Sequence, residues 1–283
     1  MLASRSGSSS PPSFPFKATL RVSISTPKRI SARDNLDFRR FLAVRNRSNR
    51  DLILVEGPKL IEEAIRSNLV LKAIAFTGPE TESSWARVGA PQFRFTAPLM
   101  KSLSDVETNQ GVVALAERPA ATTDFLEKPD ALVLILDGLQ DPGNVGTLFR
   151  TAEAAGVSGI LLTRGCADPL SPKAIRAAAG SAFRLPHRFD LVPEGLLALL
   201  PARMALVAAV AGPGSGSAFD ASLPLPLALA LGSEGSGLDP RIESASRTRV
   251  RVPVARGVES LNVAAAGAIV LFEIARRAGF LRQ

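Results

Sequence analysis

Short apolar runs alternate with segments of helical periodicity through the C-terminal half of the chain, and this alternation restricts the fold more than any other feature. The predicted strands are Ala131 to Leu136, Gly159 to Thr163, Met204 to Val210, Leu227 to Leu231 and Arg249 to Val252. The predicted helices are Val145 to Ala155, Pro172 to Ala179, Glu194 to Leu200 and Leu261 to Ala278. Continuous apolar strands are typical of sheets buried on both faces, and strands separated by helices pair in parallel. The sequence therefore predicts an α/β fold with a parallel sheet covered by helices on both faces.

Three polar segments that contain glycine stand where predicted strands end. They are Asp141-Pro-Gly-Asn-Val-Gly-Thr-Leu-Phe-Arg150, Gly232-Ser-Glu-Gly-Ser-Gly237 and Val252-Pro-Val-Ala-Arg-Gly-Val-Glu-Ser-Leu-Asn-Val263. Ligand-binding residues of open α/β sheets gather at strand ends, and the N–H groups at a helix start favour an anionic or polar ligand. We expect Asn144 and Arg150 near one another across the first helical turns, facing the strand ends. The three segments predict a binding site.

The three segments do not match the common glycine-rich nucleotide motifs. A dinucleotide site needs GxGxxG followed by an acidic residue on the next strand, whereas the strand from Gly159 to Thr163 ends at Arg164. A phosphate-binding loop needs GxxxxGK followed by Ser or Thr, and the sequence has none. These comparisons disfavour NAD and a nucleoside triphosphate as ligands.

A smaller α/β domain is predicted before the alternating region. Its predicted strands are Leu52 to Val55, Val70 to Phe76 and Gly111 to Ala116, and its predicted helices are Lys59 to Ser67 and Ala97 to Leu103. Thr, Asp and Pro between Ala120 and Pro129 indicate a linker. The predicted division of the chain is therefore an N-terminal segment of residues 1–33, a first domain of residues 34–119, a linker of residues 120–130 and a second domain of residues 131–283.

The first 33 residues contain no Asp or Glu, are rich in Ser and Pro, and carry six of the 34 basic side chains. This composition is typical of a disordered transit peptide. It predicts the chloroplast, with the mitochondrion as the alternative, and a basic tail without a targeting role is the simpler interpretation. Residues 34–283 then hold 28 basic against 26 acidic side chains, so the high pI of the whole chain is poor support for nucleic acid binding.

Clustered cations indicate phosphate binding better than an average charge does. The predicted RNA-binding cluster is Arg39, Arg40, Arg45, Arg47 and Arg50, and a second cluster is Arg247, Arg249, Arg251 and Arg256. A solvated surface is the alternative interpretation of either cluster. The apolar runs are too short to span a bilayer, and one cysteine, Cys166, cannot form an internal disulfide or a cysteine-rich zinc site. We therefore expect a soluble protein with no membrane partner and no metal.

The three polar segments together resemble the motifs of the SpoU or TrmH family of RNA ribose 2′-O-methyltransferases, and the resemblance covers Leu132 to Arg277. Leu54-Val-Glu-Gly-Pro-Lys-Leu60 and Gln110-Gly-Val-Val-Ala114 resemble the ribosomal-protein-like substrate-binding domain of the rRNA-modifying members. The resemblance implies a trefoil knot in the second domain, a homodimer, S-adenosylmethionine as the methyl donor, and RNA, foremost organellar rRNA, as the substrate. A non-catalytic RNA-binding or ribosome-assembly protein that keeps the fold is the alternative function.

The resemblance also assigns roles to individual residues. It implies that the cofactor site contains Leu231, Gly232, Val252, Val254 and Leu261. The implied catalytic residues are Asn144, Arg150, Glu234, Ser260 and Asn262. A guanidinium keeps its proton because its pKa lies above about 12, so we expect Arg150 to orient the target phosphate and to stabilise the developing oxyanion rather than to act as the base.

Some residues carry a second interpretation or depart from the family pattern. Capping of a helix or loop is the alternative role for Glu234 and Ser260. Arg256 stands where relatives have a small residue, and Val254 where many have methionine. The single histidine, His187, lies outside the three segments, so a structural role is expected for it.

Overall fold

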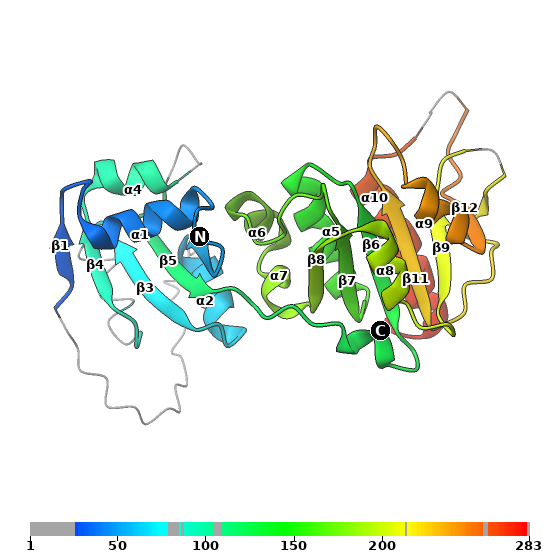
Figure 1. Cartoon of the computed structure of the whole chain (residues 1–283), viewed down its shortest axis with the longest axis horizontal. Coiled ribbons are helices and arrows are strands. Elements are labelled where there is room, and N and C mark those ends of the chain that lie inside the picture. Colours follow the sequence, from blue (N-terminus) through cyan, green and yellow to red (C-terminus); the bar gives the residue numbers. More distant parts are fainter. Residues whose placement is uncertain are drawn as a thin grey trace, which may run out of the picture.

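Two β-sheets lie side by side, and each carries its own helices (Figure 1). The computed structural model describes residues 26–78, 85, 88–104, 109–212, 214–256 and 260–281. Within these ranges no helix is long and apolar enough to cross a membrane.

The N-terminal sheet has five strands in the order β1-β4-β3-β5-β2. Its strands are β1 (Lys28–Ile30), β2 (Leu52–Glu56), β3 (Leu71–Phe76), β4 (Gln92–Phe95) and β5 (Val112–Glu117). Strand β4 pairs in parallel with β1 and β3, and β5 pairs antiparallel with β3 and β2. The helices are α1 (Leu36–Arg45), α2 (Pro58–Arg66) and α4 (Ala97–Leu103). Helices α1 and α4 bury side chains against one face of this sheet, and α2 packs on the other.

The N-terminal part differs from the prediction in where it begins. Residues 28–30 form a strand on β4 and Ile30 is buried, so the sheet starts before the predicted boundary at residue 34. Residues 1–25 of the predicted transit peptide lie outside the described residues. Helix α1 was also not predicted. Its buried residues Phe38, Phe41 and Val44 stand three apart among arginines, and the charge concealed this short apolar face.

The C-terminal sheet has seven strands in the order β10-β12-β9-β11-β6-β7-β8, and all pairs are parallel. Its strands are β6 (Leu132–Asp137), β7 (Gly159–Thr163), β8 (His187–Leu191), β9 (Ala205–Ala209), β10 (Gly216–Ser217), β11 (Leu227–Gly232) and β12 (Thr248–Arg251). The predicted parallel sheet is confirmed. Strands β8 and β10 were not predicted because β8 is polar at alternate positions and β10 has two residues only.

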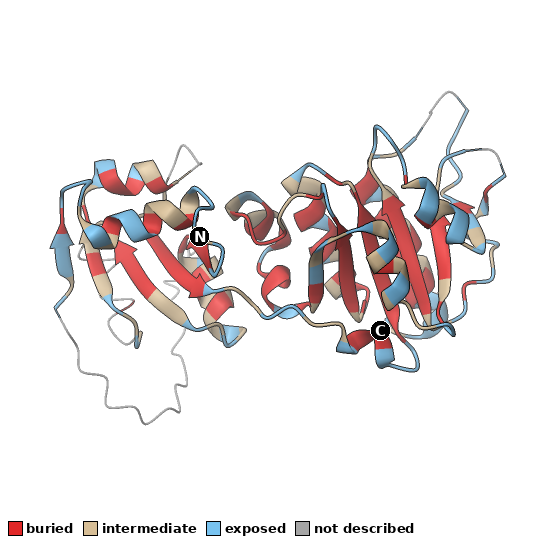
Figure 2. Ribbon diagram, viewed as in Figure 1, coloured by how far each residue is buried: buried red, intermediate tan, exposed pale blue. Residues whose placement is uncertain are grey.

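Helices cover both faces of the C-terminal sheet, whose central strands are buried (Figure 2). The helices are α5 (Pro142–Ala154), α6 (Pro172–Ala178), α7 (Ser181–Arg184), α8 (Pro193–Leu199), α9 (Pro240–Ala245) and α10 (Val263–Ala278). One face packs against α5 and α10, and the other against α8 and α9. Helix α5 packs between α6 and α10. Helix α5 begins within the first polar segment and α10 begins at the end of the third. These two helices therefore lie in contact on one face of the sheet.

The predicted linker contains a short 3-10 helix, η1 (Asp124–Glu127), that is packed into the C-terminal core. Phe125 and Leu126 are buried, and the Phe125 ring fills the space beside Gly159, where a Cβ atom would lie 2.4 Å from it. The segment thus anchors the chain to the sheet as well as connecting the two domains.

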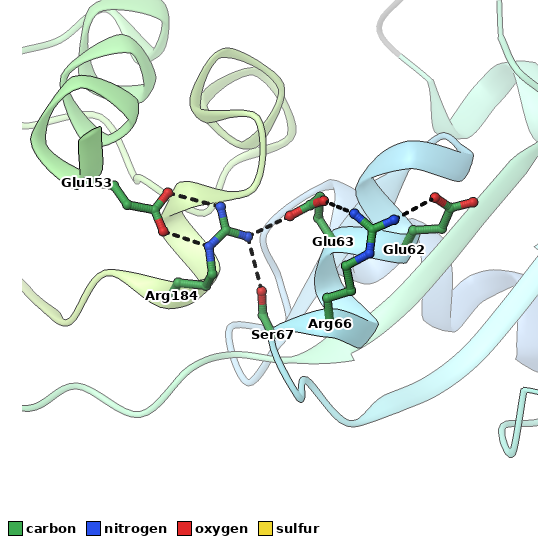
Figure 3. A network of polar contacts seen from close by, with 6 residues as sticks. All are labelled: Glu62, Glu63, Arg66, Ser67, Glu153 and Arg184. Atoms are coloured by element: carbon green, nitrogen blue, oxygen red, sulfur yellow. Dashed lines mark hydrogen bonds and ion pairs between the residues drawn. The ribbon is translucent and has the colours of Figure 1, made fainter. Parts of the chain in front are cut away.

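Ion pairs join the two domains through the region of α6 and α7. Arg184 donates from Nε and Nη2 to the Glu153 carboxylate of α5, at 2.6 and 2.9 Å, and from Nη1 to Glu63 of α2, at 2.7 Å (Figure 3). Arg118, which follows β5, donates two hydrogen bonds to Asp168, at 3.2 and 2.7 Å. Partly buried paired charges fix a geometry more than they add stability. The pairs therefore hold the first domain in register with α5.

Candidate functional site

The first polar segment forms the start of α5. Asp141 is the N-cap residue, and its carboxylate accepts hydrogen bonds from the N–H groups of Gly143 and Asn144. Lys173 of α6 donates to the same carboxylate at 2.8 Å. The Lys173 ammonium and the Gly143 N–H hold the pKa of Asp141 below its usual value. Asp141 thus stays ionised and orients the turn that presents Asn144.

Asn144, Glu234 and Asn262 form one hydrogen-bonded group, one residue from each polar segment. Glu234 Oε1 accepts from Asn144 Nδ2 at 3.2 Å and from Asn262 Nδ2 at 2.8 Å. Asn262 Nδ2 also donates to Asn144 Oδ1 at 3.1 Å. The segments are far apart in sequence, and the parallel strands bring their ends together at one edge. The structure therefore brings together these three residues, which the family resemblance assigns to one catalytic site.

Helix α10 begins inside this group. Asn262 is its N-cap residue, with Oδ1 accepting from the N–H groups of Ala264 and Ala265. Glu234 Oε1 also accepts from the Val263 N–H at 3.3 Å. The capping role considered for Glu234 is therefore part of its geometry. A carboxylate at a helix N-terminus is a favourable arrangement, because the free N–H groups there carry partial positive charge.

The second polar segment is a tight loop closed on itself. Ser233 and Gly237 exchange two backbone hydrogen bonds of 3.1 and 3.0 Å. A Cβ atom on Gly232 would lie 2.2 Å from the Gly237 carbonyl carbon and 2.3 Å from the Leu238 nitrogen. Glycine is therefore required at residue 232 by the loop itself, in addition to any contact with a cofactor.

A cavity of about 750 Å³ lies at the same edge of the sheet. All five residues predicted for the cofactor line it: Leu231, Gly232, Val252, Val254 and Leu261. A smaller cavity of about 380 Å³ is lined by Asn144, Asp141 and Gln140 among others. Glu234 lines both cavities. A ligand in the larger cavity and one in the smaller would therefore meet beside the Glu234 carboxylate.

The larger cavity fits S-adenosylmethionine in size and chemistry. Its volume falls within the range of small-molecule sites. Its lining combines apolar side chains, which suit an adenine ring, with polar and acidic ones such as Glu234, which suit a cationic sulfonium and the polar end of a methionine arm. Among the described residues, no group of three His, Cys, Asp or Glu is placed to hold a metal ion.

Arg150 stands apart from the other predicted catalytic residues. It is exposed on α5 and lines neither cavity. Six residues of helix separate it from Asn144, which corresponds to about 9 Å along the axis and roughly 120° around it. Within one chain this geometry gives no support to the expectation that the two side chains lie together. Ser260 lines the larger cavity and is exposed, while Arg256 lines neither cavity.

Sequence reasoning missed the loop that follows β9. Residues 209–212 line the larger cavity, and so do Arg249 and Arg251 of the second basic cluster. Arg249 pairs with Glu243 of α9 at 3.4 Å. The sequence did contain a signal for this loop, because predicted strand β9 ends at the same edge of the sheet as the polar segments and a glycine follows it at residue 212.

The predicted RNA-binding cluster lies on α1 and the turn after it. Arg39, Arg40, Arg47 and Arg50 are exposed, and Arg45 is partly buried and donates to Asn46. Arg118 links this turn to the second domain, since its Nε donates to the Arg50 carbonyl oxygen while its other nitrogens bind Asp168. The α1 turn therefore lies next to the segment leading into α6, whose Lys173 contacts the first polar segment.

Two titratable residues, His187 and Cys166, are buried in the second domain. His187 is buried, packs edge-to-face on Phe149 and lies 3.0 Å from the Leu185 carbonyl oxygen. Burial lowers the pKa of His187. Burial also raises the pKa of the Cys166 thiol, which donates to the Leu136 carbonyl oxygen. A neutral imidazole and a protonated thiol both fit the structural roles expected for them.

Known proteins share both parts of this architecture. Residues 131–272 match the SpoU rRNA Methylase family, and residues 37–114 match the MRM3-like substrate binding domain. The 23S rRNA (guanosine(2553)-2'-O)-methyltransferase RlmP of Bacillus subtilis is 30% identical over 238 residues, which cover 84% of this chain and 94% of that protein. The human mitochondrial rRNA methyltransferase 3 is 34% identical over 163 residues, 55% of this chain and 39% of that protein.

A solved structure places the cofactor in this family. The SpoU methyltransferase AviRb from Streptomyces viridochromogenes, in complex with S-adenosylmethionine, superposes with a TM-score of 0.78 at 28% identity, covering 88% of this chain and 100% of that one. The family, the methyl donor and the RNA methyltransferase activity expected from the three segments are thereby confirmed. The chain belongs to the SpoU rRNA methylase family of S-adenosylmethionine-dependent RNA methyltransferases.

Proposed function

We propose that this protein methylates a ribose 2′-hydroxyl of ribosomal RNA in an organelle. The observation that carries the proposal is the junction of the two cavities at Glu234, with Asn144 and Asn262 bonded to the same carboxylate oxygen. The larger cavity holds S-adenosylmethionine and the smaller one receives the target ribose. When bound, S-adenosylmethionine would supply an electrophilic methyl group for the ribose oxygen, with S-adenosylhomocysteine as the leaving group and the hydroxyl proton released.

The protein contributes mainly position and charge. The bonded group of Asn144, Glu234 and Asn262 is held rigidly by two helix starts, so it can orient a ribose without reorganising. Leu231, Gly232, Val252, Val254 and Leu261 hold the cofactor, and Ser260 faces the same cavity. Arg150 binds the phosphate of the target nucleotide.

The position of Arg150 supports a homodimer. Since this side chain is exposed and does not face the cavities of its own chain, it serves the ribose site of a second copy. Exposed apolar residues Val254 and Phe272 belong to the surface that the second copy covers.

The trefoil knot is part of the same proposal. Its support is that β12 lies beyond β9, while α10, which follows it, returns to pack against α5.

The RNA lies across both domains in this proposal. The turn after α1 presents Arg47 and Arg50, and Lys173 lies between that turn and the first polar segment. Cations spaced along a surface bind successive phosphates of an RNA strand. Because Arg118 and Arg184 fix the first domain against α6 and α7, the strand would be guided to the smaller cavity.

The organelle is supported by the acid-free, basic composition of residues 1–33. The human relative is named as mitochondrial, which fits the mitochondrion and gives no support to the chloroplast. A fluorescent protein fused after residue 33 and imaged with markers for both organelles decides between the two. Fluorescence that stays in the cytosol would contradict an organellar location.

The test of the activity uses the full chain, S-adenosylmethionine with a labelled methyl group, and ribosomal RNA from each organelle. We expect labelled 2′-O-methylribose in one of these RNAs. Asn262→Ala removes a bond to Glu234 and one to Asn144, and should reduce transfer by about 100-fold or more, as loss of a positioning group does. Arg188→Ala, exposed on β8 and outside both cavities, is the control. No calorimetric binding of S-adenosylmethionine at millimolar concentration would refute the proposal.

A further inference from the structure

Asp137 is a buried carboxylate at the end of β6 that lines neither cavity. Only 7% of its surface is exposed. A buried charge is costly unless its oxygens are hydrogen-bonded. What its two oxygens bind therefore indicates why a carboxylate is at this position.

The two oxygens of Asp137 bind different parts of the second domain. Oδ1 accepts from the Thr163 hydroxyl at 2.6 Å, and Thr163 in turn accepts from the Gly138 N–H at 3.0 Å. Oδ2 accepts from the Asp239 N–H at 2.6 Å. Asp239 lies two residues after the second polar segment and is the N-cap residue of α9.

Asp137 thereby holds both ends of the same loop. Its backbone lies opposite Gly232 in the β11–β6 pairing, where the loop begins, and its side chain holds Asp239, where the loop ends. The loop between them carries Glu234 and lines both cavities. The loop is closed on itself by the two Ser233–Gly237 hydrogen bonds, and the contacts of Asp137 fix where its two ends lie on the sheet.

We infer that Asp137 is a positioning residue for the methyltransferase reaction: through the Asp239 N–H it holds the Glu234 loop in the shape that binds S-adenosylmethionine. The inference rests on the proposed function in placing the cofactor in the larger cavity. Thr163 binds the other oxygen of the carboxylate and does not touch the loop.

The experiment compares Asp137→Ala, Asp137→Asn and Thr163→Val in the full chain. Asp137→Ala should weaken S-adenosylmethionine binding in calorimetry by about tenfold, as expected for one bond to a charged acceptor. It should also speed hydrogen exchange of the Ser233 and Gly237 amides, which close the loop. Asp137→Asn keeps an oxygen for Asp239 and can donate to Thr163, so it should restore both readouts to near the wild-type values.

Thr163→Val is the matched control, because it removes the partner of the other carboxylate oxygen. It should lower the unfolding midpoint and leave cofactor affinity and loop exchange close to wild type. Equal weakening of binding in Thr163→Val and Asp137→Ala would overturn the inference, and so would wild-type binding by Asp137→Ala. If the wild-type protein itself does not bind S-adenosylmethionine, the proposed function fails, while the exchange measurement still tests the anchor.

Discussion

Replacing Gly232 with alanine tests whether the second polar segment is held by close backbone contact. The φ angle of Gly232 is not in the left-handed region, so alanine can adopt the backbone conformation. The added Cβ atom, however, would lie 2.2 Å from the Gly237 carbonyl carbon, whereas real Cβ contacts essentially never fall below 3.0 Å. The loop must therefore move by about 1 Å, and overpacking of this kind costs about 1 to 3 kcal/mol.

The strain should appear in cofactor binding, because the loop can relieve it by opening. Opening breaks the two hydrogen bonds between Ser233 and Gly237 and deforms the larger cavity. We expect the binding free energy of S-adenosylmethionine to become less favourable by about 2 to 3 kcal/mol. In calorimetry this is equivalent to about 30- to 150-fold weaker binding. Gly235→Ala is the control, since its Cβ atom would meet nothing within 4 Å. Wild-type affinity in Gly232→Ala, or equal loss in Gly235→Ala, would refute the reasoning.

Three further predictions concern separate parts of the molecule. Arg150→Ala should abolish methyl transfer while leaving S-adenosylmethionine affinity unchanged, since Arg150 lines neither cavity; equal loss of both would contradict its role. Arg184→Ala should lower the unfolding free energy measured in urea by about 1 to 2 kcal/mol, because the partly exposed ion pairs of Arg184 that join the two domains are lost. Arg188 is exposed, and Arg188→Ala should leave the unfolding free energy unchanged. Because burial lowers the pKa of His187, the unfolded chain takes up the proton first, so stability should fall as the pH drops below about 6.5, by at most about 1.4 kcal/mol per pH unit. His187→Phe should remove that dependence, and its persistence would mean that another group is responsible.

The sequence predicted the parts of the structure that depend on local pattern. Apolar runs such as Leu227 to Leu231 are buried strands, because a strand covered on both faces has no polar side. The three polar segments do meet at one edge, because parallel strands end on the same side of a sheet. Helix α1 and strand β8 escaped prediction, since a short apolar face between arginines and a half-exposed strand give weak periodicity.

By itself, then, the sequence determined the α/β class, the family and five of the residues that line the larger cavity, because strand ends and their glycines are visible as short stretches of consecutive residues. The tertiary structure decided what consecutive residues cannot express. It bonded Glu234 to Asn144 and Asn262, left Arg150 exposed and outside both cavities, and placed the buried Asp137 at both ends of the Glu234 loop. Such contacts join residues that are far apart in sequence, and their geometry follows only from how the helices and strands pack.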